Sequence, residues 1–205
     1  MCLIPLFVNL HHKKIVLAGG GTVAARKLQK LLPFHHNITI VSPEISSIIQ
    51  NLIDQYQIQW IKARCQLSHM TEADVIIIAT NDPATNQYLA EHAPEKAWVN
   101  ASHQAHVGNL QFPITINKGR LQVAISTGGA SPILAQKIKQ TIEEQIPDSY
   151  EQYIDFLYQA RITVRTHIAS AQKRQELLQT IVDEPIFSTR AQQDWLDHVA
   201  QMKSM

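Results

Sequence analysis

A glycine-rich segment near the N-terminus has the residue types and spacing of a phosphate-binding turn. It consists of Gly19, Gly20, Gly21, Thr22, Val23 and Ala24 and lies between an apolar run and a stretch of helical spacing. In the pattern G-x-G-x-x-A the first glycine permits a tight turn, the second lets a pyrophosphate approach the backbone, and the alanine lets helix and strand pack closely. Because a helix N-terminus also offers N–H groups to phosphates, the segment predicts dinucleotide binding; the alternative is a turn that only packs.

Polar residues that follow two other apolar runs are expected to meet the same cofactor. Ser42 stands where an Asp or Glu would hold the adenosine ribose, and its hydroxyl can serve a ribose instead. No arginine follows it to bind a 2′-phosphate, so the sequence favours NAD over NADP. We expect Thr80, Asn81 and Asp82 to line the cofactor cleft near the second ribose or the nicotinamide. They also suit a capping turn before a helix that begins at Pro83, and both roles can hold together.

A second cluster of small residues lies at positions 126–132, between an apolar run and a helix-like stretch. Its members that we predict to bind substrate are Ser126, Thr127, Gly128 and Ser131. A strand-to-helix turn of this kind exposes several N–H groups, and this geometry suits an anionic group. The alternative is a plain turn in which Ser131 only caps the helix.

The elements that must position these residues alternate between strand and helix in the first half of the chain. Apolar runs predict strands over residues 14–18, 37–42, 58–61, 75–80 and 97–101, and helical spacing predicts helices over residues 22–32, 45–56 and 83–93. Strands that are apolar on both faces and alternate with helices indicate a parallel sheet covered on two sides. We therefore predict a doubly wound, Rossmann-type α/β domain that binds NAD over residues 1–112.

From residue 112 onward the pattern changes. Residues 113–117 and 121–126 predict the two strands of a hairpin, and Ser131 and Pro132 open a helix that runs to about residue 146. The rest is helical in pattern nearly to its end, with a break near Pro185. We expect a small α+β dimerisation region over residues 113–147 and a helical domain over residues 148–205. The hairpin would leave apolar faces uncovered in a monomer, which favours a homodimer.

Composition and charge exclude several classes of protein. The 205 residues are 45% hydrophobic and 17% charged with a net charge of +1, so nothing points to nucleic acid. No apolar run approaches the roughly 18 residues of a membrane helix. The N-terminus is apolar first and basic second, the reverse of a secretory signal, so we expect a cytoplasmic protein without a membrane partner. Cys2 and Cys65 form neither a C-x-x-C pair nor a zinc motif, and no metal site is predicted.

In this order the motifs resemble the precorrin-2 dehydrogenase family, whose module also forms the N-terminal part of trifunctional siroheme synthases. The resemblance is carried by residues 5–10, 19–27, 79–82, 86, 99–100, 112–113 and 125–132. It covers residues 3–147, with a family-like helical tail after them, and adds Asn100 to the predicted substrate-binding residues. It implies oxidation of precorrin-2 to sirohydrochlorin with NAD⁺ in siroheme biosynthesis. It also implies an intimate homodimer with the active cleft between the nucleotide domain and the dimerisation region, and some members additionally insert Fe²⁺.

One segment departs from the family pattern. Many members carry an aspartate shortly after the Val-Asn pair, proposed to act in dehydrogenation and chelation, but residues 101–109 contain no carboxylate. His103 falls at the matching position, and His106 lies three residues further on. A histidine titrates near pH ~6.5 and can take up a proton, so both are predicted catalytic residues; the alternative is that both are solvent-facing. Metal insertion needs a base near the pyrrole nitrogens, so iron insertion is expected to be weak or absent.

Other functions stay open on the sequence alone. A short-chain dehydrogenase needs a Tyr-x-x-x-Lys pair, which none of the tyrosines between residues 150 and 158 has, and this disfavours that class. A dinucleotide-sensing regulatory domain that dimerises through its second half is a non-enzymatic alternative. A bifunctional dehydrogenase and ferrochelatase is a third. Turnover of precorrin-2 with NAD⁺ separates the precorrin-2 dehydrogenase from the short-chain dehydrogenase and from the sensing domain.

Overall fold

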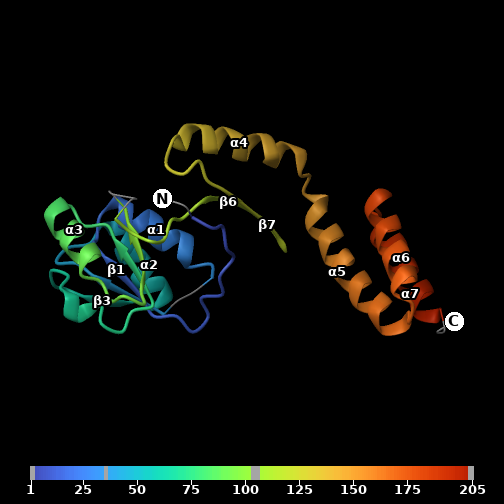
Figure 1. Cartoon of the computed structure of the whole chain (residues 1–205), viewed down its shortest axis with the longest axis horizontal. Helices are drawn as coiled ribbons and strands as arrows, with labels where there is room; N and C mark the ends of the chain where they lie inside the picture. The colour runs from blue at the N-terminus through green and yellow to red at the C-terminus, as the bar shows by residue number, and fades with distance from the viewer. Residues whose placement is uncertain (1–2, 35–36, 103–106, 203–205) are drawn as a thin grey trace. The chain divides into compact units, whose positions relative to one another are not determined.

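The computed structural model describes residues 3–34, 37–102 and 107–202. The chain divides into two compact units, residues 1–112 and 113–205 (Figure 1). Within the described ranges no helix is long and apolar enough to cross a membrane. The further division of the second unit at residue 147, into a dimerisation region and a helical domain, stays a prediction.

A five-stranded parallel sheet forms the centre of the first unit. Its strands are β1 (Ile15–Ala18), β2 (Ile38–Val41), β3 (Gln59–Ile61), β4 (Val75–Ile78) and β5 (Trp98–Ala101). They lie in the order β3-β2-β1-β4-β5, so the carboxyl ends of all five meet at one edge and the strand order reverses between β1 and β4. The predicted Rossmann-type sheet is confirmed.

Helices cover both faces of this sheet because its central strands are apolar on both sides. The covering elements are α1 (Thr22–Leu31), α2 (Ser47–Tyr56), α3 (Pro83–Glu91) and the 3-10 helix η1 (Leu67–His69). On one face Leu28 of α1 and Ile49 of α2 pack against the strands. On the other face Leu89 of α3 and Met70, which follows η1, do so. The link from β3 to β4 thus covers its face with a short 3-10 helix instead of an α-helix.

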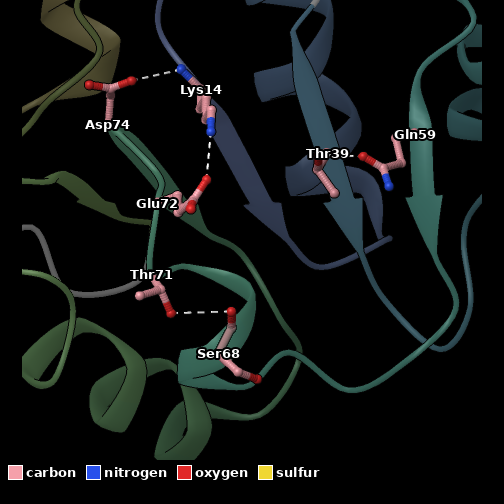
Figure 2. A network of polar contacts seen from close by, with 7 residues as sticks. All are labelled: Lys14, Thr39, Gln59, Ser68, Thr71, Glu72 and Asp74. Carbon is pink, nitrogen blue, oxygen red and sulfur yellow. Dashed lines mark hydrogen bonds and ion pairs between the residues drawn. The ribbon is translucent and has the colours of Figure 1, made fainter.

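At the amino-terminal edge of the sheet, charged side chains tie β1 to β4. The Lys14 backbone N–H donates to Asp74 Oδ2 at 2.8 Å, and Lys14 Nζ donates to Glu72 Oε2 at 2.6 Å (Figure 2). Lys13 Nζ donates to Asp74 Oδ1 at 3.0 Å. The hydrogen bond from the Lys14 N–H lowers the pKa of Asp74. The bond between Lys14 and Glu72 lowers the pKa of Glu72 and raises the pKa of Lys14. The charges of this edge are therefore paired within the protein.

A two-stranded hairpin and one long helix open the second unit. They are β6 (Ile114–Lys118), β7 (Leu121–Ile125), which pair antiparallel, and α4 (Pro132–Gln145). Ser131 caps α4 by accepting a hydrogen bond from the Leu134 N–H at 3.1 Å, and Pro132 takes the first helical position. Ile133 and Leu134, in the first turn of α4, are 84% and 50% exposed. These apolar side chains are left uncovered within the described chain.

The rest of the second unit is a group of three helices, which confirms the predicted helical C-terminal part. They are α5 (Ser149–His167), α6 (Ala171–Asp183) and α7 (Thr189–Gln201). Phe156, Ile181 and Trp195 bring one residue from each helix into a shared apolar cluster. The sequence predicted one break, near Pro185, but a second lies between α5 and α6. There Ser170 accepts a hydrogen bond from the Lys173 N–H and starts α6 as its N-cap.

Candidate functional site

The glycine turn after β1 is packed so closely that two of its three glycines leave no room for a side chain. Gly19 has a φ of +123°, and a Cβ added to it would lie 2.2 Å from the Ala79 carbonyl oxygen. A Cβ on Gly20 would lie 1.9 Å from the Glu44 carbonyl oxygen. The loops that follow β4 and β2 therefore close on the turn from two sides, and both glycines are needed for the fold itself.

Gly21 differs from these neighbours, since a Cβ added to it would meet no atom within 4 Å. It is the N-cap of α1, and no side chain caps that helix, whereas Ser46, Asp82 and Ser131 cap α2, α3 and α4 with their side chains. The first turn of α1 consists of Thr22, Val23 and the fully buried Ala24. Open space beside an uncapped helix N-terminus, with its partial positive charge, fits the pyrophosphate of a dinucleotide.

The loop after β2 brings an acidic residue to the glycine turn, one that the sequence interpretation missed. Ser42 is 6% exposed, and its hydroxyl donates to the Glu44 carbonyl oxygen at 2.6 Å. Trp60 Nε1 donates to the Ser42 carbonyl oxygen at 2.9 Å. The hydroxyl hydrogen of Ser42 is thus used inside the loop, while Glu44 touches Gly20 with its backbone and is itself exposed. The available signal was an acid 23 residues after Gly21, near the spacing of about 20 at which a ribose-binding acid is found.

The three predicted residues after β4 lie at the same carboxyl edge. Thr80 Oγ1 donates to Asn86 Oδ1 at 2.5 Å. Asn81 is exposed, and Asp82 caps α3. A hydrogen bond from the Thr85 hydroxyl lowers the pKa of Asp82. Two of the three side chains therefore build the turn, and Asn81 is an exposed polar group beside it.

The end of β5 holds two buried polar atoms that have no hydrogen-bond partner in the structure as described, Asn100 Oδ1 and Ser102 Oγ. Asn100 is 6% exposed, and its Nδ2 donates to the Leu110 carbonyl oxygen at 2.8 Å. Ser102 lines a small pocket together with Asn86 and Val107. A buried polar group without a partner costs about 1–3 kcal/mol. Among the described residues, these are therefore polar atoms at the end of β5 that a bound water or ligand would satisfy.

The two predicted catalytic histidines, His103 and His106, lie outside the described residues, so their role stays a prediction. Among the residues that are described, no three His, Cys, Asp or Glu side chains converge as metal ligands. Cys65 is buried, and this burial raises the pKa of its thiol to about 11. A thiol with so high a pKa is almost entirely protonated near neutral pH and is a poor nucleophile.

The predicted substrate loop lies between β7 and α4, in the second unit, and its own hydroxyls organise it. Thr127 Oγ1 accepts a hydrogen bond from the Ser131 N–H at 3.1 Å, and Ser126 Oγ accepts one from the Gly128 N–H at 3.1 Å. Gly128 and Gly129 have φ angles of +62° and +87°, and a Cβ on either would meet no atom within 4 Å. The loop thus combines a fixed backbone with open space on its glycine side.

Family models match three consecutive parts of the chain. Residues 6–114 match the family described as putative NAD(P)-binding, which covers the first unit. Residues 118–145 match a family described as the central part of a sirohaem biosynthesis protein, and residues 150–195 match a SirC C-terminal domain.

The relatives and a solved structure each match between 78% and 97% of the chain. Precorrin-2 dehydrogenase of Priestia megaterium is 31% identical over 97% of this chain and 98% of its own length. Precorrin-2 dehydrogenase of Bacillus subtilis is 31% identical over 78% of this chain and 98% of its own length. Siroheme synthase of Actinobacillus pleuropneumoniae is 28% identical over 90% of this chain, which spans 38% of that longer protein. A solved structure of SirC, a precorrin-2 dehydrogenase, superposes with a TM-score of 0.82 at 30% identity, covering 96% of this chain and 98% of that one.

Proposed function

The chain belongs to the precorrin-2 dehydrogenase family, and we propose that it oxidises precorrin-2 to sirohydrochlorin with NAD⁺. The similarity to a precorrin-2 dehydrogenase over 97% of the chain carries this proposal. The cofactor, when bound, supplies the hydride acceptor. The residues of this chain contribute the open face at Gly21, the N-terminus of α1 and the turn after β4, which together hold a dinucleotide along the carboxyl edge.

The oxidation removes a hydride and a proton from the substrate, so the site also needs a proton acceptor. His103 and His106 are our candidates because a neutral imidazole accepts a proton near neutral pH. Replacing each by alanine tests them. A slower oxidation at unchanged NAD⁺ affinity supports the assignment, and unchanged rates in both variants leave solvent as the acceptor.

Turnover is the direct test of the proposed function. Purified protein is given precorrin-2 and NAD⁺, and NADH and sirohydrochlorin are followed together. We expect the two products in equal amounts, and no turnover from Gly21→Asp, which places bulk and negative charge where the pyrophosphate is proposed to bind. NAD⁺ binding without product formation from the unmodified protein would instead favour the dinucleotide-sensing alternative.

For the choice between NAD and NADP we propose that Glu44 is decisive. Its exposed side chain lies on the loop that touches the glycine turn, where an acid can bind the adenosine 2′-hydroxyl and repel a 2′-phosphate. We expect a lower KM for NAD⁺ than for NADP⁺. In Glu44→Gln the two KM values should lie closer together. Glu95→Gln, which changes an exposed acid away from the turn, is the matched control. Equal preference in the two variants would refute the role of Glu44.

For the substrate we propose that the loop of Ser126, Thr127, Gly128 and Ser131 receives carboxylates of the tetrapyrrole, and that Asn100 contributes from the end of β5. The open glycine side of the loop and the N-terminus of α4 support this assignment. Gly128→Asp should raise the KM for precorrin-2 and leave the dissociation constant of NAD⁺ unchanged. An unchanged KM for precorrin-2 would remove the loop from the substrate site.

We further propose a homodimer formed through the second unit. The exposed Ile133 and Leu134 of α4 support it, since burying apolar surface of this kind drives association. Sedimentation should give a dimer at micromolar concentration, weakened by Ile133→Glu and unaffected by the neighbouring polar change Gln136→Glu. A monomeric unmodified protein would contradict the proposal.

Iron insertion is proposed to be weak or absent, because residues 101–109 hold no carboxylate that could act as a base beside the macrocycle. Sirohydrochlorin and Fe²⁺ are mixed with the protein, and siroheme formation is compared with the uncatalysed rate. Rapid insertion would show that this chain performs the chelation step without that carboxylate.

A further inference from the structure

One buried side chain holds the turn between β4 and α3. Asn86, on α3, is 6% exposed. Its Oδ1 accepts hydrogen bonds from the Thr80 N–H at 3.2 Å and from Thr80 Oγ1 at 2.5 Å, and its Nδ2 donates to the Thr80 carbonyl oxygen at 3.0 Å. A single amide thus binds both backbone groups and the hydroxyl of Thr80.

Packing alone does not explain an amide at this position. The inward side of α3 buries only Asn86 and Leu89 among its described residues, and an apolar side chain would fill the same space as the amide. An apolar residue would, however, leave the N–H and carbonyl of the half-buried Thr80 without the partners that the amide supplies. The amide is therefore fitted to the turn rather than to the core.

The same turn borders the glycine turn after β1. A Cβ on Gly19 would lie 2.2 Å from the Ala79 carbonyl oxygen and 3.0 Å from the Thr80 nitrogen, so Thr80 forms part of the wall against which Gly19 packs. Asp82 N–H donates to Thr80 Oγ1 at 3.2 Å, and the Asn86 N–H donates to the Asp82 carbonyl oxygen at 3.0 Å. The bonds from Asn86 thus fix the position of Thr80 relative to both α3 and the glycine turn.

We propose that Asn86 is a positioning residue of the dehydrogenase, which acts through Thr80 on the nicotinamide half of the cofactor. This inference rests on the proposed function. Thr80 follows β4, whereas the loop with Glu44 follows β2, and β1 lies between these strands. In this fold a dinucleotide binds across the strand-order reversal between β1 and β4. The turn that Asn86 holds is therefore on the opposite side of β1 from the adenosine loop.

The expected effect of Asn86→Leu is a loss of rate rather than of cofactor binding. Displacing reacting groups by about 1 Å can cost on the order of 100-fold in rate. We expect kcat for precorrin-2 oxidation to fall by about tenfold or more. The NAD⁺ dissociation constant should change by less than about threefold, because the contacts at α1 and the adenosine loop are retained.

Gln192→Leu is the matched control, because Gln192 of α7 is another buried side-chain amide that bonds to the backbone of a loop. It is 8% exposed, and its Nε2 donates to the Ile186 carbonyl oxygen at 2.7 Å, in the second unit. Both variants should lower the melting temperature, but only Asn86→Leu should lower kcat in the folded protein. A merely structural Asn86 would give the same kcat in both variants.

Asn86→Asp supplies a second measurement if the leucine variant does not fold. Its carboxylate keeps an acceptor for Thr80 but loses the donor to the Thr80 carbonyl, and protonation restores that donor. The ratio of the kcat of Asn86→Asp to that of the unmodified protein should therefore rise as the pH falls.

The results separate this inference from the proposed function. An unmodified protein without turnover refutes the proposed function and this inference with it. An active unmodified protein, together with an Asn86 variant of normal kcat or a pH-independent Asn86→Asp ratio, refutes the inference alone. A loss confined to NAD⁺ affinity also refutes it, because the adenosine half would then be what Asn86 positions.

Discussion

The two edges of the five-stranded sheet differ in how their polar groups are paired. At the amino edge Lys14, Glu72 and Asp74 pair their charges within the protein. At the carboxyl edge α1 begins without a side-chain cap, Gly21 faces open space, and Asn100 Oδ1 and Ser102 Oγ lack partners among the described residues. The polar groups of the amino edge bond to one another, whereas several polar groups of the carboxyl edge remain available to a ligand.

This contrast shows where stability and function divide in the first unit. Exposed ion pairs contribute little to stability, and the charges at the amino edge already have partners within the protein. Uncapped N–H groups and open glycine faces lower stability slightly but create a place for an anionic cofactor. Changes at the amino edge should therefore alter stability alone, whereas changes at the carboxyl edge should separate into those that affect folding and those that affect binding.

The largest expected effect belongs to Gly20→Ala, a carboxyl-edge change that acts on folding. The added methyl group would lie 1.9 Å from the Glu44 carbonyl oxygen, and a backbone atom cannot move aside as a flexible side chain can. We expect a loss of about 3 kcal/mol or more in the free energy of unfolding. Urea denaturation measures it. A variant as stable as the unmodified protein would show that the loop after β2 does not press on the glycine turn.

A smaller effect is expected from Lys27, a lysine on α1 whose amine lies 4.7 Å from the centroid of the Phe112 ring. Burial, aided by the nearby Lys30 and Arg26, lowers the pKa of Lys27 to about 8. A lowered pKa means that the fold favours the neutral amine over the charged one. The contribution of Lys27 to stability is therefore complete above the ordinary pKa of 10.5, where the amine is neutral, and is lost as the pH falls through about 8.

Lys27→Met keeps the length of the side chain and removes the charge. The variant should be more stable than the unmodified protein at pH 7, and this advantage should shrink as the pH rises from about 8 towards 10.5. Melting temperatures measured across this range test the prediction. A difference that does not depend on pH would mean that the cation–π contact with Phe112 compensates for the burial.

The smallest effect is expected at the amino edge, from Asp74→Asn. The lowered pKa of Asp74 means that its stabilising contribution is present above the ordinary value of 3.8 and is lost as the pH falls through the lowered pKa. The variant should melt at a slightly lower temperature at pH 7 and match the unmodified protein in strong acid. Its kinetic constants should be unchanged. An altered KM for NAD⁺ would contradict the division of roles between the two edges.

Much of the fold could be predicted because its signals are local. The central strands of the sheet, such as β1 and β4, are apolar on both faces, and the glycine pattern lies between a strand and a helix. Strand type and turn position therefore followed from short windows of sequence. The second break in the C-terminal helices was missed although Ser170 is a capping residue type. No proline or glycine accompanies it, and the helical spacing continues on both sides.

The site was less predictable because its contacts join distant residues. Ser42 has a residue type suited to a ribose, but only the path of the loop shows that its hydroxyl donates to the Glu44 carbonyl. Likewise the contact between Glu44 and Gly20 depends on how the loop folds back, which no spacing rule specifies. The three bonds from Asn86 to Thr80 depend on the angle at which α3 leaves the sheet.

Gly21→Ala tests the central claim, that the carboxyl edge keeps open space for a dinucleotide, most directly. The added methyl group would meet no atom of the protein within 4 Å, and the φ of Gly21, −86°, is allowed for alanine. Calorimetric titration with NAD⁺ on a variant shown to be as stable as the unmodified protein is the measurement. We predict at least a tenfold weaker affinity, about 1.4 kcal/mol, because the methyl group occupies the space beside the pyrophosphate. Undiminished NAD⁺ affinity in the stable variant would contradict the account.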